Sequence, residues 1–432
     1  MESSPHKPES IRYLPLSYDN ADSENTAFQL IFALRPEWRE SASTIEFIRF
    51  TDGITNTLLK AVNKEPGLSE RQIDREAILL RAYGKGTDVL IDRERETLAH
   101  SLLARHGLAP PLLARFDNGL LYKFIEGSVC SPADLRRPEV WRAVAKQLGE
   151  WHATLPISSI SSESPVHGSI VNGSVNGSPT KPRSKRTASL EAIEKLTPGK
   201  PTPNIWTVIQ KWILALPTTT SAEKNRRDQL QIELEQLVKQ FGNTTGIGGS
   251  KPFVFAHCDL LSGNVIIQPP SSSSSSRSSQ SSGSDEPETP CTVSFIDYEY
   301  ATPAPAAFDL ANHFAEWGGL DCDFSVLPTR FQRRDFLKEY LLSYNSHLER
   351  SFKDVELNQL FDEVDRFRGV PGFYWGIWAL IQAQISQIDF DYASYAEIRL
   401  GEFWAWKAEV DGSREKCAKE MPLREQRWAQ DS

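Results

Sequence analysis

The chain has 432 residues, of which 39% are hydrophobic and 24% charged, a composition typical of a globular protein long enough for two lobes. Its net charge of −9 disfavours a nucleic-acid partner, and no apolar run approaches the roughly 20 residues that span a bilayer. The five cysteines are scattered and lack Cys-x-x-Cys pairs, which argues for a reducing compartment and against a structural zinc site. The N-terminus lacks the apolar core of a signal peptide, so we expect a cytoplasmic location.

The first part of the chain predicts a small sheet lobe over residues 27–125, preceded by a polar segment, 1–26, that we expect to be disordered. Strand-like runs and the turns between them follow in the order 45–50, 51–56, 57–62, 77–84 and 120–127. One helix is predicted over 92–106, with Leu98 and Leu102 on one face. The run 120–127 is expected to form the last strand of this lobe and the hinge that leaves it.

Beyond residue 126 the pattern becomes helical and predicts a larger C-terminal lobe, 126–432. Pro138 begins a helix, and 223–241 predicts an amphipathic helix. Two low-complexity stretches, at about 158–204 and 269–290, cannot bury enough apolar surface to fold and are expected to be disordered insertions. The second lies between two strand-like runs, so we expect it to leave their pairing intact.

The most informative stretch spaces acidic and amide residues in the order that phosphoryl transfer needs. His257-Cys258-Asp259 is followed by Asn264, and Asp297 ends a later apolar run. This chemistry requires a carboxylate that orients the attacking hydroxyl and oxygen ligands that hold Mg²⁺. In protein kinases a catalytic-loop Asp precedes the metal-binding Asn by the same spacing, and a second Asp follows a later strand. We therefore predict a phosphotransferase in which Asp259 is catalytic, with Asn264 and Asp297 as metal ligands.

Around these residues the chain resembles the choline/ethanolamine kinase family. The shared motifs are Asp259-Leu-Leu-Ser-Gly-Asn264, Ile296-Asp297-Tyr-Glu299-Tyr300, Asp309-Leu-Ala-Asn-His-Phe-Ala-Glu316-Trp317, Trp378-Ala-Leu-Ile-Gln-Ala and Ile388-Asp-Phe-Asp-Tyr392. The resemblance covers about 44–157, 205–268 and 292–410. It implies a bilobal, protein-kinase-like α/β (α+β) fold, with a small antiparallel-sheet lobe carrying one helix and a larger helical lobe. It also implies ATP and Mg²⁺ as the nucleotide and metal.

The resemblance assigns further residues to the nucleotide and the metal. The residues implied for the nucleotide are Gly53, Thr55, Asn56, Arg81, Glu96, Lys123 and Ile125. Among them, Arg81 would contact the phosphates and pair with Glu96, as a Lys–Glu pair does in protein kinases. Glu299 would join or support the metal ligands Asn264 and Asp297. Asp309 would brace the catalytic loop by accepting backbone N–H bonds.

For the amine site the resemblance implies the aromatic residues Trp375, Trp378, Tyr392 and Tyr395. Glu316 would either contact the amine or support the metal ligands, and Asp321 is a further candidate for the amine. By spacing alone, the two aromatic pairs fit a helical core as well as a pocket. A quaternary ammonium needs aromatic faces, whereas a primary ammonium also donates hydrogen bonds to carboxylates. Choline kinases carry a tyrosine shortly after the Glu-Trp pair, but here the segment contains Asp321 and no tyrosine. This difference favours ethanolamine, with choline kinase as the alternative.

We expect the protein to phosphorylate ethanolamine, the first step of phosphatidylethanolamine synthesis by the CDP-ethanolamine route. Cys258 stands where the family usually has Asn, which leaves a non-catalytic, ATP-binding regulator as a rival. An aminoglycoside phosphotransferase has no reason for the aromatic pairs, and no Ala-Pro-Glu-like segment supports a protein kinase. The expected partner is a small molecule, with no stable membrane insertion and with a homodimer as an assembly that the sequence permits.

Overall fold

The computed structural model describes residues 11–50, 56–84, 86–157, 193, 195–196, 199–249, 252–269 and 291–432. The chain forms two compact units: unit 1 is Met1–Trp151 with Leu260–Tyr300, and unit 2 is His152–Asp259 with Ala301–Ser432. The predicted lobes, 27–125 and 126–432, stay predictions; in the structure, residues 126–151 and 260–300 group with the N-terminal part. Among the described residues, no helix is both long and apolar enough to cross a membrane.

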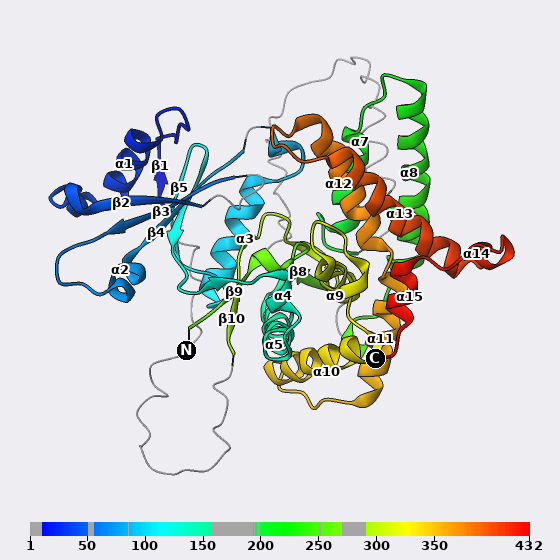
Figure 1. Cartoon of the computed structure of the whole chain (residues 1–432). Coiled ribbons are helices and arrows are strands. Elements are labelled where there is room, and N and C mark those ends of the chain that lie inside the picture. Colours follow the sequence, from blue (N-terminus) through cyan, green and yellow to red (C-terminus); the bar gives the residue numbers. More distant parts are fainter. Residues whose placement is uncertain are drawn as a thin grey trace, which may run out of the picture. The chain divides into compact units, whose positions relative to one another are not determined.

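Unit 1 is built on a six-stranded sheet (Figure 1). Its strands are β1 (Tyr13–Leu14), β2 (Ile45–Phe50), β3 (Thr57–Asn63), β4 (Ile78–Ala82), β5 (Leu112–Phe116) and β6 (Gly119–Lys123), in the spatial order β1-β5-β6-β4-β3-β2. Only the β1–β5 pair is parallel. A second sheet contains β7 (Ser128–Val129), β9 (Val265–Ile267) and β10 (Val293–Phe295). The helices are α1 (Ser23–Leu34), α2 (Glu70–Glu76), α3 (Arg93–Arg105), α4 (Pro132–Leu135) and most of α5 (Pro138–Thr154).

One face of the large sheet forms the core of unit 1 with α1. Alternate residues such as Leu59, Ile78 and Leu80 are buried against Leu30 and Ile31 of the helix. Alternation along a strand places the intervening side chains on the opposite face, where polar residues of the site lie. The β9–β10 pairing is antiparallel across the 269–290 insertion, which confirms that the insertion leaves the pairing intact.

Three expectations for this unit are wrong. Residues 11–26 are ordered, because β1 pairs with β5 and the start of α1 contributes Ala27 to the core. The lobe has more than the one predicted helix: α2 begins after a capping box in which Ser69 and Gln72 bond each other's backbone N–H groups. Leu98 does not join the core, since its side chain is 53% exposed.

Unit 2 is mainly helical. Its two-stranded sheet pairs β8 (Phe253–Ala256) with β11 (Thr302–Pro305). Its helices are the end of α5, α7 (Ile205–Ala215), α8 (Ser221–Phe241), α9 (Ala306–Ala315), α10 (Arg330–His347), α11 (Asp354–Phe367), α12 (Val370–Ile385), α13 (Tyr392–Val410), α14 (Ser413–Lys416) and α15 (Leu423–Ala429). The predicted amphipathic helix is confirmed as α8, which Thr220 caps through a capping box. All ten residues of α9 are buried, so this helix forms the centre of the unit.

Candidate active site

Arg81 lies in unit 1 on the face of β4 opposite the core. Leu80 points into the core, so the next side chain along the strand points away from it. The Arg81 guanidinium meets three carboxylates: Nη1 is 3.0 Å from Glu96 Oε1, Nη2 is 2.7 Å from Asp297 Oδ1, and Nη2 also contacts Glu299. The structure thus brings together the predicted Arg81–Glu96 pair and two of the predicted metal-site residues.

Glu299 is held by a second arginine and an amide. Arg93 Nη1 is 3.4 Å from Glu299 Oε2 and 3.0 Å from Glu96 Oε2, and Asn56 Nδ2 donates to Glu299 Oε2 over 3.1 Å. Burial, reinforced by the Asp297 charge, raises the pKa of Glu299. Burial by itself would lower the pKa of Arg81, but the three carboxylates raise it well above its usual value. Arg81 is therefore permanently charged, and it orients the acidic groups around it.

Asn264 directly precedes β9 and Asp297 follows β10, and the pairing of these two strands brings the two residues close together. The Ile296 N–H donates to the Asn264 carbonyl over 3.0 Å, directly before Asp297. The Asp297 side chain is 30% exposed and the Glu299 side chain 2%. An amide oxygen and an accessible carboxylate fit the hard-ligand preference of Mg²⁺, which is usually bound by one or two carboxylates together with nucleotide phosphates. Asp297 is thus better placed than Glu299 to bind a metal directly.

The predicted catalytic loop follows β8 in unit 2 and is held by α9. The Asp309 carboxylate accepts the N–H groups of His257 and Cys258 at 2.9 and 2.7 Å, and Asn312 Nδ2 donates to the Cys258 carbonyl at 3.0 Å. Cys258 has a φ of +64°, a left-handed conformation that few residues adopt readily. These bonds fix the backbone directly before Asp259, as the resemblance implied for Asp309.

His152 is a supporting residue that sequence reasoning missed. It lies near the end of α5, and its Nε2 is 3.0 Å from Asp309 Oδ2, while Nδ1 is 2.8 Å from the Tyr340 hydroxyl. Burial alone would raise the pKa of Asp309, but the His152 hydrogen bond and nearby charges hold it below its usual value. The carboxylate that braces the loop is therefore ionised. In the sequence, His152 is one member of an apolar helical stripe, so its spacing carries no sign of this role.

The four predicted amine-site aromatics lie in one cluster in unit 2. We define the aromatic cluster as Trp375, Trp378, Phe390, Tyr392 and Tyr395. Ring centroids are 5.4 Å apart for Trp375 and Trp378 and 5.7 Å apart for Trp378 and Tyr392, and Phe390 stands between Tyr392 and Tyr395 at 4.8 and 5.6 Å. Phe390 was not predicted, although it lies in the quoted Ile388–Tyr392 motif. Trp375 Nε1 donates to Asn312 Oδ1 over 2.8 Å, which joins this cluster to the catalytic loop.

The two predicted acidic residues of the amine site differ in their surroundings. Glu316 begins the 3-10 turn after α9 and is buried, and Arg399 Nη1 lies 3.1 Å from its Oε1. Burial raises the pKa of Glu316, and the Arg399 charge counteracts that effect. Asp321 is exposed. Glu316 is therefore the predicted carboxylate that the structure ties to the amine-site elements.

The remaining nucleotide predictions stay predictions. Gly53 and Thr55 lie outside the described residues. The N–H of Lys123 donates to the Pro111 carbonyl over 3.0 Å and is thus used within the sheet lobe. Ile125 lies two residues after the end of β6.

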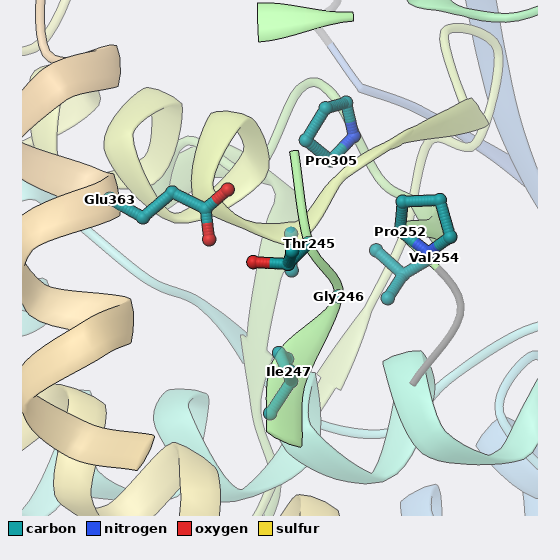
Figure 2. A pocket seen from close by; sticks show the side chains of 8 residues that line it. Thr245, Gly246, Ile247, Pro252, Val254, Pro305 and Glu363 are labelled. Atoms are coloured by element: carbon teal, nitrogen blue, oxygen red, sulfur yellow. The ribbon is translucent and has the colours of Figure 1, made fainter. Parts of the chain in front are cut away.

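A small pocket in unit 2 borders the start of β8 and the start of α9 (Figure 2). It is lined by Thr245, Gly246, Ile247, Pro252, Val254, Pro305, Ala306 and Glu363. None of the predicted site residues lines it. Glu363 is its one charged lining residue, and burial raises the pKa of this carboxyl to about 7 against the weaker opposing effects of Arg366 and Thr244.

Glu363→Gln is expected to raise the melting temperature at pH 8 and to have little effect near pH 5. The folded state binds the Glu363 proton more tightly than the unfolded chain, whose pKa is near 4.5. The stability is therefore fully present below pH 4.5 and is lost as the pH rises through 7; a shift of this size is worth at most about 3 kcal/mol. Thermal unfolding of both proteins between pH 5 and 8 measures it, with Asp362→Asn as the control on the same helix. A pH-independent difference would contradict the expectation.

The chain is similar to known proteins over most of its length. Residues 47–404 match the model of the family described as choline/ethanolamine kinase. Ethanolamine kinase 1 of Mus musculus is 30% identical over 395 residues, covering 89% of this chain and 89% of that protein. Ethanolamine kinase 1 of Homo sapiens is 31% identical over 395 residues, covering 89% of this chain and 72% of that protein.

Two solved structures have a similar fold. An ethanolamine kinase of Plasmodium vivax aligns with a TM-score of 0.59 and 23% identity, covering 89% of this chain and 88% of that one. A choline kinase of Cryptosporidium parvum aligns with a TM-score of 0.57 and 19% identity, covering 90% of this chain and 97% of that one. They confirm the predicted kinase-like fold. Because the family model and the curated relatives each match most of its length, the chain belongs to the choline/ethanolamine kinase family.

Proposed function

We propose that the protein phosphorylates ethanolamine with Mg·ATP, yielding phosphoethanolamine and ADP. The observation that carries this proposal is the hydrogen-bonded connection within unit 2 between the catalytic loop and the aromatic cluster. Asn312 donates to the Cys258 carbonyl, one residue before Asp259, and accepts a hydrogen bond from Trp375. The Asn312 side chain thus connects the loop that carries the proposed base, Asp259, with the aromatic cluster proposed to bind the amine. The curated relatives named ethanolamine kinase support the choice of amine.

In the proposed reaction, Asp259 accepts the proton of the ethanolamine hydroxyl while that oxygen attacks the γ-phosphorus. The new O–P bond forms as the bond from the γ-phosphorus to the bridging oxygen breaks, and ADP leaves with that electron pair. Arg81, oriented by Glu96, binds the phosphates. Bound Mg²⁺, for which Asn264 and Asp297 are the proposed ligands, would neutralise phosphate charge during transfer. We assign Glu299 the supporting role of holding Arg81 and Arg93.

Amine recognition is proposed to combine the aromatic cluster with Glu316. A primary ammonium carries three N–H donors and gains from a carboxylate acceptor, in addition to the aromatic faces. A quaternary ammonium interacts with the rings only, so we propose choline as a secondary substrate. We further propose a cytoplasmic enzyme, because its substrates are water-soluble small molecules.

The test is ADP release by the purified protein with Mg·ATP and, in turn, ethanolamine, choline or no amine. Turnover stimulated most by ethanolamine is expected. Higher kcat/KM for choline would replace the proposed substrate. ATP binding without amine-stimulated turnover would instead support the regulator that Cys258 suggests.

The structure supports an active enzyme despite Cys258. The contacts of this residue with Asp309 and Asn312 are made by its backbone N–H and carbonyl, which any residue supplies. Its Sγ is 4.0 Å from the Thr302 carbonyl, a weak interaction. A Cys in place of the family's usual Asn therefore keeps the backbone hydrogen bonds that brace the loop.

Cys258→Asn is expected to stabilise the protein by about 0.5–1 kcal/mol and to keep its turnover, because Asn tolerates positive φ better than Cys. The new amide would also stand near the Thr302 carbonyl, to which it could donate, since the present Sγ lies 4.0 Å from that oxygen. Denaturant unfolding measures the gain. Cys258→Ala, which has no amide and the same backbone strain, serves as the control, and equal stability of the two variants would contradict the expectation.

A further inference from the structure

Six acidic and basic side chains in unit 2 form a continuous line that begins at the proposed amine site. We define this buried charge chain as Glu316, Arg399, Glu402, Arg424, Glu425 and Arg368. Acidic and basic residues alternate along it, and the side chains from Glu316 to Glu425 are each 5% exposed or less. The chain joins the turn after α9 to α13, to α15 and to the residue that ends α11.

The links have ion-pair geometry. From Arg399, Nη1 is 3.1 Å from Glu316 and Nε is 3.1 Å from Glu402. Arg424 continues the line, with Nε 3.0 Å from Glu402 and Nη1 3.0 Å from Glu425. Arg368 Nε ends it at 2.9 Å from Glu425.

Each interior member of the buried charge chain depends on two neighbours. A buried charge is tolerated only when it is paired, and removing one partner leaves the other uncompensated. Glu402 divides its two oxygens between Arg399 and Arg424, so the loss of Arg424 leaves one carboxylate oxygen without its cation. Glu402 would then draw more strongly on Arg399, whose other partners include Glu316 and the Tyr395 hydroxyl, 3.3 Å from Nη1.

We propose that Arg399 is a positioning residue that aligns Glu316 and Tyr395 for the amine, and that helix α15 sets this alignment through Arg424 and Glu402. The inference rests on the proposed function, since Glu316 and Tyr395 are amine-site residues only under it. Arg424 lies beyond the segment 47–404 that the family model matches, so the support comes from a part of the chain outside that model.

The effect is confined to amine binding. Arg399 contacts two side chains proposed to bind the substrate, Glu316 and Tyr395. A residue that aligns such groups changes KM for the amine, whereas loss of the base lowers kcat. The KM for ATP provides the internal reference.

Steady-state kinetics of Arg399→Lys, Arg399→Met and Arg424→Met test the proposal, with the full-length protein and both amines. Arg424→Met is expected to raise KM for ethanolamine by about five- to thirtyfold, with KM for ATP unchanged. Arg399→Met is expected to raise it further, and Arg399→Lys to recover part of the loss because one ion pair is retained. If Arg399→Met does not fold, the KM values of Arg424→Met and Arg399→Lys test the proposal.

Arg333→Met is the matched control. Arg333 is also a fully buried arginine that holds α15: its guanidinium is 4.0 Å from the Trp428 ring, and Nη2 is 3.3 Å from Asp365, which also accepts from Trp428. It does not belong to the buried charge chain. This variant is expected to melt at a lower temperature with KM for ethanolamine unchanged.

An equal rise in KM for ethanolamine in Arg333→Met and Arg424→Met would overturn the positioning role and leave a structural one. Equal rises in KM for ethanolamine and for ATP would do the same. A wild-type protein that phosphorylates neither amine would overturn the proposed function, and this inference with it. An active wild type with unchanged KM in the Arg399 and Arg424 variants would overturn the inference alone.

Discussion

Asp259→Asn is expected to lower kcat for ethanolamine by about 10²–10⁴-fold while the melting temperature stays close to that of the wild type. The amide cannot accept the hydroxyl proton. The loop keeps its shape because Asp309 holds it through the backbone of His257 and Cys258. ADP release and thermal unfolding of the same preparation measure both quantities.

The control for this variant is Asp354→Asn, an exposed carboxylate at the start of α11. Asp309→Asn provides the contrast, since it removes a buried hydrogen-bond acceptor and should lower both the melting temperature and kcat. Retention of more than a tenth of the wild-type kcat in Asp259→Asn would exclude this residue as the base.

Arg81→Met is expected to lower the free energy of unfolding by about 3–5 kcal/mol and to weaken ATP binding. Arg81 compensates Glu96 and Glu299, which are both buried, and it also pairs with Asp297. Without it, Glu96 keeps its pair with Arg93, and Glu299 keeps Arg93 and the Asn56 amide. Their pKa values, already raised by burial, should rise further.

The pH dependence separates this cause from a simple packing defect. A carboxyl whose folded pKa is raised stabilises the protein below its unfolded pKa, and this stability is lost as the pH rises through the folded value. The deficit of Arg81→Met should therefore shrink from pH 8 to pH 5. Denaturant unfolding at both pH values measures it, with Arg49→Met on the exposed part of β2 as the control. A deficit that is equal at both pH values would exclude uncompensated carboxylates as its origin.

The features that could be predicted from the sequence are those with local spacing. The separation of Asp259 and Asn264 carries the phosphotransfer signal within a few residues, and apolar runs on either side of 269–290 were enough to predict the pairing of β9 and β10. The helix α2 was predictable too, because Ser69 and Gln72 have capping-box spacing. The N-terminal segment was misjudged because composition reports average polarity and does not reveal that Leu14 and Tyr18 are buried in the core.

The charged contacts could not be predicted in this way. His152 and Asp309 are 157 positions apart, and their hydrogen bond depends on how α5 and α9 pack. The same holds for Arg399 and Arg424. In the sequence they resemble ordinary cations on a helix surface, whereas in the structure they are buried and paired with carboxylates. A partner chosen by tertiary packing leaves no periodic trace in a single sequence.

The covering of the sheet by α1 has a practical consequence for producing the protein. The family match begins at residue 47, after both β1 and α1. A fragment cut to the matched region would leave Leu59, Ile78 and Leu80 facing water across one side of the sheet. A broad apolar sheet face of this kind promotes aggregation. Expression plasmids for crystallography or assays should therefore start before residue 11 and retain α15, and solubility lost on trimming should not be attributed to the enzyme itself.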